Sequence, residues 1–306
     1  MPDTTVLSRR SFCRGAAAAG AIAALGARAG SAAVAPPADP KSAWKIGCFT
    51  RPWDRHDYRT ALDAIAEAGY SYAGLMTAKS PSGLVISAAT TAEEAARVGE
   101  EAKKRGLKIP SVYGGDIPVK ESLEAGIAAM KRLIDNCAAA GATSLMMGGT
   151  GDPKLNDIYY KAVAETCAYA AEKKIGITVK PHGGLNATGP QCRALIAKVG
   201  HPNFRLWYDP GNIFYYSDAK LDPVDDAATV DGLVAGMSVK DYRHPKDVML
   251  TPGTGQVDFK AVMARLKKGG FTSGPLVVET LRAGELPVLA EEAVKARKFV
   301  EAFASA

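Results

Sequence analysis

Short apolar stretches alternate with longer amphipathic stretches along most of the chain. The apolar stretches predict eight β-strands, at residues 44–49, 72–76, 109–113, 144–147, 176–180, 204–208, 233–239 and 276–279. Apolar residues at helical spacing fill most of the intervals. They predict helices at 57–68, from a Thr91 cap to Gly106, and at 286–303. Strand and helix therefore alternate from residue 44 to the end of the sequence.

Eight strand–helix units in about 260 residues fit a single-domain (β/α)₈ TIM barrel. The strands are apolar throughout, as expected when helices or side chains cover both faces of a sheet. A doubly wound open sheet is the structural alternative. No G-x-G-x-x-G sequence follows the first strand, which argues against that alternative and against a nucleotide cofactor.

The N-terminus has the composition of an export signal. Ser8-Arg9-Arg10-Ser11-Phe12 precedes an Ala/Gly-rich apolar stretch at 15–27, a pattern typical of twin-arginine signals. We predict an export signal with its cleavage region at 1–35, a Pro-rich linker at 36–43 and a barrel at 44–306. The apolar stretch is short of the roughly 20 strongly apolar residues that span a bilayer, so the mature protein is expected in the periplasm or outside the cell, without a membrane anchor. A disordered basic tail is the alternative.

Charge and cysteine content exclude several classes of protein. The net charge is +6, but without the arginine-rich first thirty-odd residues it is +3, and no basic run remains. Nucleic acid is therefore not expected as a partner. The mature chain keeps Cys48, Cys137, Cys167 and Cys192, none in a C-x-x-C pair, which argues against a zinc knuckle. We expect Cys137 and Cys167 to be buried free thiols.

Charged and aromatic residues follow the predicted strands, at the end where TIM-barrel enzymes place their chemistry. A charge above the apolar core of a barrel is costly unless it is paired, so these residues indicate either an active site or an ion-pair network at the rim. The strand-end candidates are Arg51, Trp53, Tyr113, Lys180, His182, Asp209, Asn212, Lys240, Asp241, Tyr242 and Glu279.

Four motifs occur in the order found in one known family. They are Tyr208-Asp209-Pro210-Gly211-Asn212, Val239-Lys240-Asp241-Tyr242, Gly253-x-Gly255-x-Val257-Asp258-Phe259 and Val277-Val278-Glu279. From about Trp44 to Ala304 the sequence resembles the sugar phosphate isomerase/epimerase family of xylose isomerase-like barrels. The resemblance implies a divalent cation, Mn²⁺ or Mg²⁺, held by a Glu, an Asp, a His and a second Glu at the ends of strands five to eight. It also implies proton transfer through an enediolate.

This chain keeps two of those four positions and departs at the other two. Asp209 and Glu279 match, whereas Lys180 stands in place of the first Glu and Ser238 in place of the His. An ammonium cannot ligate a cation, so Lys180 is expected to pair with the carboxylates in place of the metal. Its alternative role is a neutral base or Schiff-base amine. His182 has three alternative roles. It could ligate a displaced metal together with Asp209 and Glu279, act as an acid/base, or cap the following turn.

The resemblance gives a set of expected roles. Lys180, Glu279 and His182 are the catalytic candidates, and the residues expected to bind substrate are Arg51, Trp53, Asn212, Lys240 and Asp241. The predicted function is an exported isomerase or epimerase for an unphosphorylated sugar or keto-sugar. Alternatives are a keto-sugar lyase, a non-catalytic carbohydrate-binding or partner barrel, and a phosphodiester-cleaving barrel. The last needs a multi-metal His/Glu cluster, and the chain has only four histidines.

The export signal gives the first testable prediction. Replacing Arg9 and Arg10 by lysine keeps the charge but removes the paired guanidinium groups that define a twin-arginine signal. We expect the precursor of this double variant to remain in the cytoplasm, as measured by immunoblotting of cell fractions. An unchanged periplasmic yield would contradict the prediction.

Overall fold

A computed structural model describes residues 43–305 of the chain. The predicted export signal and all but the last residue of the predicted linker lie outside the described residues. All described residues belong to one compact unit. Within residues 43–305, no helix combines the length and apolarity needed to cross a membrane.

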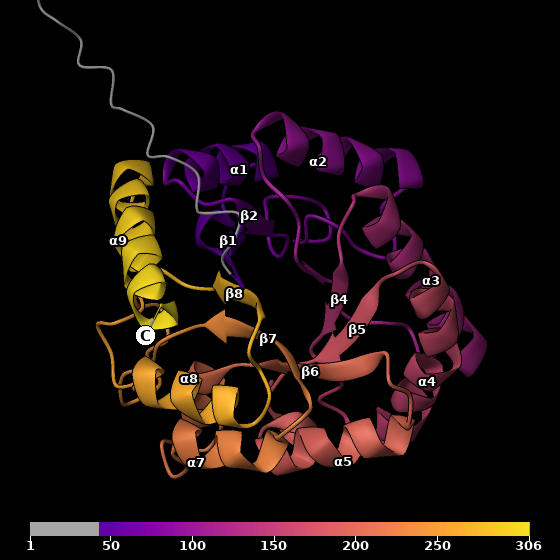
Figure 1. Cartoon of the computed structure of the whole chain (residues 1–306). Helices are drawn as coiled ribbons and strands as arrows, with labels where there is room; N and C mark the ends of the chain where they lie inside the picture. The colour runs from indigo at the N-terminus through magenta and orange to yellow at the C-terminus, as the bar shows by residue number, and fades with distance from the viewer. Residues whose placement is uncertain (1–42, 306) are drawn as a thin grey trace, which may run out of the picture. The chain divides into compact units, whose positions relative to one another are not determined.

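The described residues form an eight-stranded parallel sheet that curls into a barrel inside a ring of helices (Figure 1). The strands are β1 (Trp44–Phe49), β2 (Tyr72–Gly74), β3 (Val112–Tyr113), β4 (Ser144–Met147), β5 (Gly176–Val179), β6 (Phe204–Tyr208), β7 (Val234–Val239) and β8 (Gly274–Val278). Their hydrogen-bonded order is β2, β1, β8, β7, β6, β5, β4, β3. The predicted single-domain (β/α)₈ barrel is confirmed.

The barrel closes between β2 and β3 through isolated bridges instead of a continuous ladder. Tyr72 pairs with Lys108, and Leu75 pairs with Val112, both in parallel orientation. The sequence predicts a third strand at 109–113, but β3 contains only Val112–Tyr113. Pro110 has no backbone N–H to give to a ladder, which accounts for the late start of this strand.

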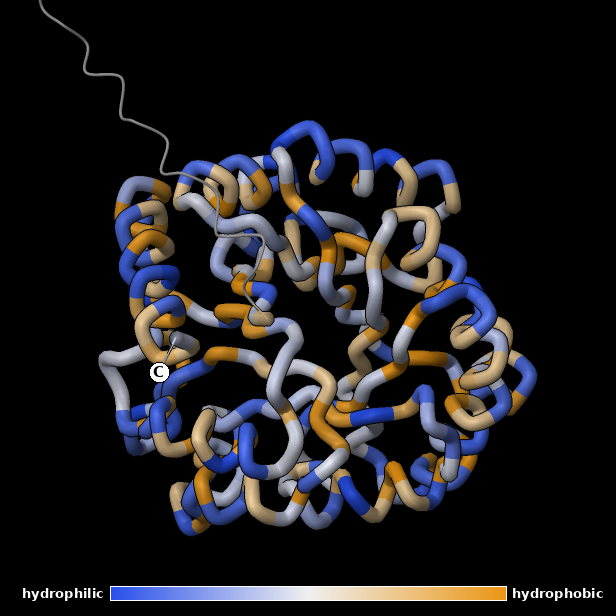
Figure 2. Tube along the Cα trace, viewed as in Figure 1, coloured by the Kyte–Doolittle hydropathy of each residue, from blue (hydrophilic) through white to orange (hydrophobic). Residues whose placement is uncertain are grey.

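Helices cover the outer face of the sheet. They are α1 (Tyr58–Glu67), α2 (Ala92–Lys104), α3 (Leu123–Ala139), α4 (Asn156–Glu172), α5 (Gly189–Val199), α6 (Pro210–Tyr216), α7 (Pro223–Ala227), α8 (Phe259–Lys268) and α9 (Leu286–Ala304), with 3₁₀ turns η1 (Arg51–Trp53), η2 (Pro153–Leu155), η3 (Gly184–Asn186) and η4 (Ala228–Val230). Thr91 and Glu94 form a capping box at the start of α2, which confirms the predicted cap. Hydrophilic positions of the helices alternate with hydrophobic ones along the trace (Figure 2).

A separate hydrophobic cluster consists of Phe49, Met76, Met146, Trp207 and Val277. Because successive residues of a strand point to opposite faces and the helices pack on the outer one, this cluster fills the inside of the barrel. The indole of Trp207 fits because its neighbour in β7 is Gly236, where a Cβ atom would lie 2.4 Å from the indole ring. The barrel interior is therefore a packed floor, and polar chemistry is confined to the strand ends above it.

The cysteines and the surface agree with a folded barrel core. Cys48, Cys137, Cys167 and Cys192 are all buried and free, as predicted for Cys137 and Cys167.

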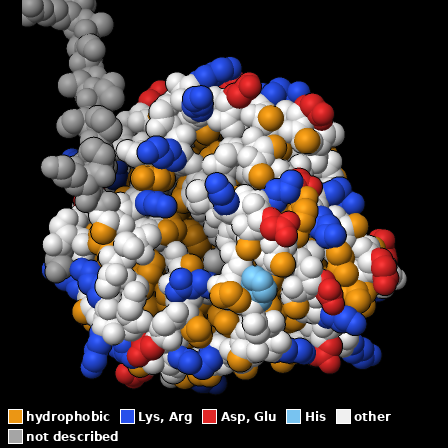
Figure 3. All heavy atoms as spheres, turned by 45° about the vertical axis from the view of Figure 1, so that its right-hand side comes forward, with side chains coloured by type: hydrophobic (Ala, Val, Ile, Leu, Met, Phe, Trp, Pro, Cys, Tyr) orange, Lys and Arg blue, Asp and Glu red, His pale blue; other side chains and the backbone are white. Residues whose placement is uncertain are grey.

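His201, at the opposite end of the barrel from the strand-end candidates, accepts a hydrogen bond at Nδ1 from the backbone N–H of Asn203 (3.1 Å). On the face drawn in Figure 3, lysine and arginine side chains are interspersed with acidic and hydrophobic ones instead of forming one patch.

Candidate active site

Four consecutive strands each end immediately before a charged residue. Lys180 follows β5, Asp209 follows β6, Lys240 follows β7 and Glu279 follows β8, and none of these four residues is more than 3% exposed. Parallel strands place their carboxyl ends at the same edge of the sheet, so the four side chains converge above the hydrophobic floor. With Arg51 from η1 they form what we call the charge cluster.

Cations and carboxylates alternate around a closed ring in this cluster. The ammonium of Lys180 lies 2.9 Å from Oδ2 of Asp209 and 2.7 Å from Oε2 of Glu279. The ammonium of Lys240 lies 3.3 Å from the same Asp209 oxygen and 2.9 Å from Oε1 of Glu279. Each buried charge is thus within contact distance of two opposite charges, which offsets the cost of removing it from water.

Glu279 accepts four donors, two at each carboxylate oxygen. Besides the two lysines, Nη1 of Arg51 lies 2.6 Å from Oε1, and the Ser238 hydroxyl donates to Oε2 at 2.7 Å. Ser238 in turn accepts a hydrogen bond from the indole N–H of Trp207 at 3.0 Å. The indole occupies the acceptor side of the hydroxyl, so the serine proton is directed at Glu279.

Burial and charge act in opposite directions on the pKa values of the cluster. Burial raises the pKa of Glu279, but Lys180, Lys240 and Arg51 outweigh it and hold that pKa well below its usual range. Burial lowers the pKa of Lys180, yet the two carboxylates raise it above the ordinary lysine value. For Lys240 burial prevails, aided by repulsion from Lys180 and Arg51, and its pKa is lowered. Glu279 is therefore a fixed anion, and Lys180 is the more firmly protonated of the two lysines.

His182 lies beside the cluster between two tyrosine rings. Its ring centroid is 6.2 Å from that of Tyr113 and 6.0 Å from that of Tyr216. A Cβ atom at Gly148 would lie 2.7 Å from the Tyr113 hydroxyl and 3.2 Å from Nδ1 of His182, so glycine there lets both groups approach the end of β4. Burial, with repulsion from Lys180, lowers the pKa of His182 to about 4, which leaves a neutral imidazole at neutral pH.

Asp241, predicted to bind substrate, is buried and bonds to the protein backbone instead. Each carboxylate oxygen of Asp241 accepts two backbone N–H groups, from Tyr242 and Val257 at one oxygen and from Gly253 and Gly255 at the other. This arrangement gives Asp241 the role of holding the loop between β7 and α8.

Asn212 and two aromatic candidates are also engaged in packing. The Asn212 side chain donates to the carbonyl oxygen of Pro181 at 2.6 Å, and its backbone N–H donates to Oδ1 of Asp209 at 2.9 Å. Trp53 is packed in the main hydrophobic core. Tyr242 is buried and stacks on Phe214 with ring centroids 5.3 Å apart. Of the three aromatic strand-end candidates, Trp53, Tyr113 and Tyr242, Tyr113 is the one that lies beside the cluster, next to His182.

The residues present do not fit a divalent metal ion. Both oxygens of Glu279 accept two donors each, and Asp209 accepts two ammonium groups at one oxygen and a backbone N–H at the other. A metal ion in the cluster would have to displace cations of the protein's own from these oxygens. Among residues 43–305, no group of three or more His, Cys, Asp or Glu side chains is arranged to hold a metal ion.

Three side chains beside the cluster were not assigned a role from the sequence. Ser238 and Trp207 form the relay to Glu279, and Tyr216 faces His182 from the end of α6. The positions of Ser238 and Trp207 could have been predicted from the sequence. Each lies two residues before a strand-end charge and so points to the same face of the sheet as that charge. The position of Tyr216 could not have been predicted, because it lies at the end of a short helix whose direction the sequence does not specify.

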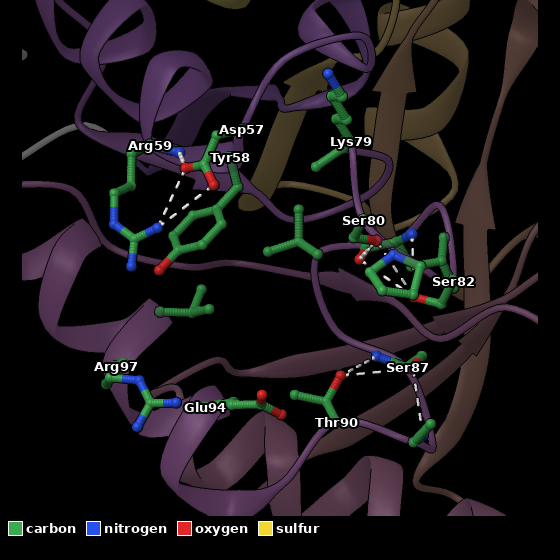
Figure 4. A pocket seen from close by; sticks show the side chains of 16 residues that line it. Asp57, Tyr58, Arg59, Lys79, Ser80, Ser82, Ser87, Thr90, Glu94 and Arg97 are labelled. Carbon is green, nitrogen blue, oxygen red and sulfur yellow. Dashed lines mark hydrogen bonds and ion pairs between the residues drawn. The ribbon is translucent and has the colours of Figure 1, made fainter.

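A surface hollow lies apart from the charge cluster. Its volume is about 460 Å³, and it is lined by the start of α1, residues 78–90 and the first part of α2 (Figure 4). Arg59 pairs there with Asp57 at 3.3 Å and lies over the Tyr58 ring at 4.5 Å. No residue of the charge cluster lines this hollow. It is therefore a surface feature separate from the strand-end chemistry.

Residues 62–301 match the family described as "Xylose isomerase-like TIM barrel". No curated protein matches the sequence. Several solved structures have the same fold at low sequence identity. A xylose isomerase domain protein from Planctomyces limnophilus is 18% identical, with a TM-score of 0.66 over 85% of this chain and 97% of that one.

Two further similar structures are sugar epimerases. A D-psicose 3-epimerase crystallised in the presence of D-fructose is 14% identical, with a TM-score of 0.65 over 86% of this chain and 100% of that one. A D-allulose 3-epimerase from Methylomonas sp., in complex with D-allulose, is 18% identical, with a TM-score of 0.66 over 87% of this chain and 99% of that one. At these identities the likeness shows the fold.

The geometry of Asp241 gives a prediction about stability. In Asp241→Asn, one oxygen becomes an NH₂ group that faces two backbone N–H donors, so two charge-assisted hydrogen bonds are lost. We expect a loss of about 2–4 kcal/mol in the free energy of unfolding, measured by urea denaturation. Asp247→Asn is the matched control, because Asp247 lies in the same loop with an exposed carboxylate that accepts one backbone N–H, from Met249. Equal stability of the two variants would contradict the structural role of Asp241.

Proposed function

Because the chain belongs to the xylose isomerase-like TIM barrel family, we propose that it is an isomerase or epimerase that moves a proton next to the carbonyl of an unphosphorylated sugar or keto-sugar. The observation that carries this proposal is the ring of Lys180, Asp209, Lys240 and Glu279 at the ends of β5 to β8. Chemistry of TIM-barrel enzymes takes place at this end of the strands. The epimerases of the same fold support a sugar as the substrate.

In the proposed mechanism, ammonium groups supply the positive charge of the site. Removing a proton next to a carbonyl develops negative charge on the carbonyl oxygen. Lys180 is a firmly protonated cation above a buried floor with Lys240 beside it, and such preorganised charge stabilises an enediolate by several kcal/mol. Glu279 and Asp209 hold the two ammonium groups in place, and their oxygens are already occupied by donors.

His182 is the proposed proton carrier. A neutral imidazole accepts a proton at one nitrogen, and the pKa of about 4 keeps His182 neutral above that pH. Neither ring nitrogen has a hydrogen-bond partner within the described part of the chain. Tyr113 and Tyr216 flank the ring, and burial raises the pKa of both hydroxyls, so they remain protonated and can donate to sugar oxygens.

Two other functions of this site are distinguished by experiment. The occupied oxygens of Glu279 favour a barrel that binds carbohydrate without turning it over, because no carboxylate of the cluster is free to accept a proton. A keto-sugar lyase would use the same enolate and then expel a substituent. We also propose that the protein acts in the periplasm or outside the cell, which fits an unphosphorylated substrate.

The proposal predicts that Lys180 is needed for proton transfer. We expect Lys180→Met to lower the rate of exchange between carbon-bound hydrogen of a keto-hexose and solvent deuterium by at least about a hundredfold, since about 3 kcal/mol of enolate stabilisation is lost. The exchange is followed by NMR, with circular dichroism to verify the fold. Lys198→Met is the control, because Lys198 forms an exposed ion pair with Asp157.

Three outcomes of this measurement separate the functions. Full exchange in Lys180→Met would remove Lys180 from the mechanism, and reduction by borohydride that traps substrate on Lys180 would indicate a Schiff base. Binding of sugar by the native protein without any exchange would favour the non-catalytic barrel. Exchange accompanied by loss of a substituent would identify a lyase.

The cluster also predicts weak metal binding that a single substitution strengthens. We expect the purified protein to contain less than one equivalent of Mn²⁺ or Mg²⁺ by elemental analysis. Lys180→Glu removes an ammonium and adds a third carboxylate, so Mn²⁺ affinity, measured by titration calorimetry, is expected to rise at least about tenfold. A tightly bound stoichiometric ion in the native protein would refute the assignment of the lysines as its replacement.

A further inference from the structure

Cations outnumber carboxylates in the charge cluster. Arg51, Lys180 and Lys240 face Asp209 and Glu279, so the cluster has one positive charge more than its own anions balance. His182 adds no charge at neutral pH. Asp116, which follows β3, is exposed and forms no ion pair with any residue in 43–305, so water screens its charge. A surplus cation at the mouth of a buried site attracts an anionic ligand.

The surplus charge is located at Arg51. Its Nη1 binds Glu279, whereas Nε and Nη2, which share the other edge of the guanidinium, have no partner within the described residues. The side chain is 30% exposed, while those of the two lysines are almost completely buried. Neither free nitrogen is among the buried polar atoms that lack a partner, so solvent reaches this edge. Arg51 thus offers an unused pair of N–H donors at the mouth of the barrel.

We infer that the substrate of this site is a sugar acid, whose carboxylate binds the free edge of Arg51 and supplies the missing negative charge. This inference rests on the proposed function and narrows its substrate to keto-sugars that carry a carboxylate. The planar fork of a guanidinium matches the two oxygens of a carboxylate. A carboxylate that binds Arg51 lies beside Glu279 and leaves the two lysines to the reacting carbonyl.

Charge and geometry favour a carboxylate over the other sugar classes. A neutral ketose leaves the surplus charge unbalanced and the Nε/Nη2 edge without an ionic partner. A sugar phosphate brings about −1.5 to −2 charges at neutral pH, which exceeds the single surplus charge of the cluster. A carboxylate brings one negative charge and so brings the cluster with its ligand to neutrality.

Titration calorimetry with three related ligands tests this inference. The ligands are 5-keto-D-gluconate, D-fructose and D-fructose 6-phosphate, each titrated into the purified protein at low salt. We expect the keto-acid to bind at least about tenfold more tightly than fructose, because a charge-assisted guanidinium–carboxylate pair contributes more than a hydroxyl contact. Arg51→Gln is expected to bring this ratio close to one. Arg55→Gln, which removes an exposed arginine four residues further on, is expected to leave it unchanged.

The outcomes for the inference and for the proposed function are separate. Equal binding of fructose and the keto-acid, or no binding of the keto-acid, would overturn the inference, and tighter binding of the phosphate would assign the site to phosphorylated sugars. A preference for the keto-acid that Arg51→Gln does not reduce would also overturn it. Deuterium exchange into any of the three ligands reports on the proposed function alone. A tightly bound keto-acid without exchange would uphold the substrate class and refute isomerisation.

Discussion

The carboxylate of Glu279 is the group on which the site depends. It is 1% exposed and accepts four donors that come from η1, from the ends of β5 and β7 and from within β7. A carboxylate removed from water without such partners would take up a proton or prevent burial of the strand end. Lys180 and Lys240 also need partners of opposite charge in order to be buried, and Glu279 and Asp209 are those partners.

The sequence predicts the barrel and the residues of the cluster for a simple reason. Strands covered on both faces are apolar, so a charged residue at the end of each marks the end of the strand and the common edge of the sheet. The sequence does not predict in which direction a side chain in a loop points. Asp241 directly follows Lys240 yet binds backbone amides, and Trp53 lies two residues after Arg51 yet packs in the core. Such directions depend on loop backbone geometry, which residue spacing does not determine.

The departures from the family pattern form one connected group. Lys180 and Ser238, at the two positions that differ, both donate to the same oxygen of Glu279. Lys240, which the pattern does not use as a ligand, completes the ring. Lys180 alone would face two carboxylates, and Lys240 adds a second ammonium that contacts the same two groups. In the proposed function, the positive charge of the site thus belongs to lysine side chains of the protein itself, and the site does not need to take up a metal ion from solution.

The closure of the barrel between β2 and β3 has a consequence for local unfolding. Only isolated bridges and a few backbone hydrogen bonds join these two strands, while β1 and β8 share a five-residue register. The charge cluster is held by β5 to β8 and by the turn after β1, on strands that pair with their neighbours in hydrogen-bonded parallel ladders. Opening at the β2–β3 junction therefore costs less free energy than opening elsewhere in the sheet and leaves the paired charges in place. The barrel can fluctuate at its weakest junction without exposing its buried ions to water.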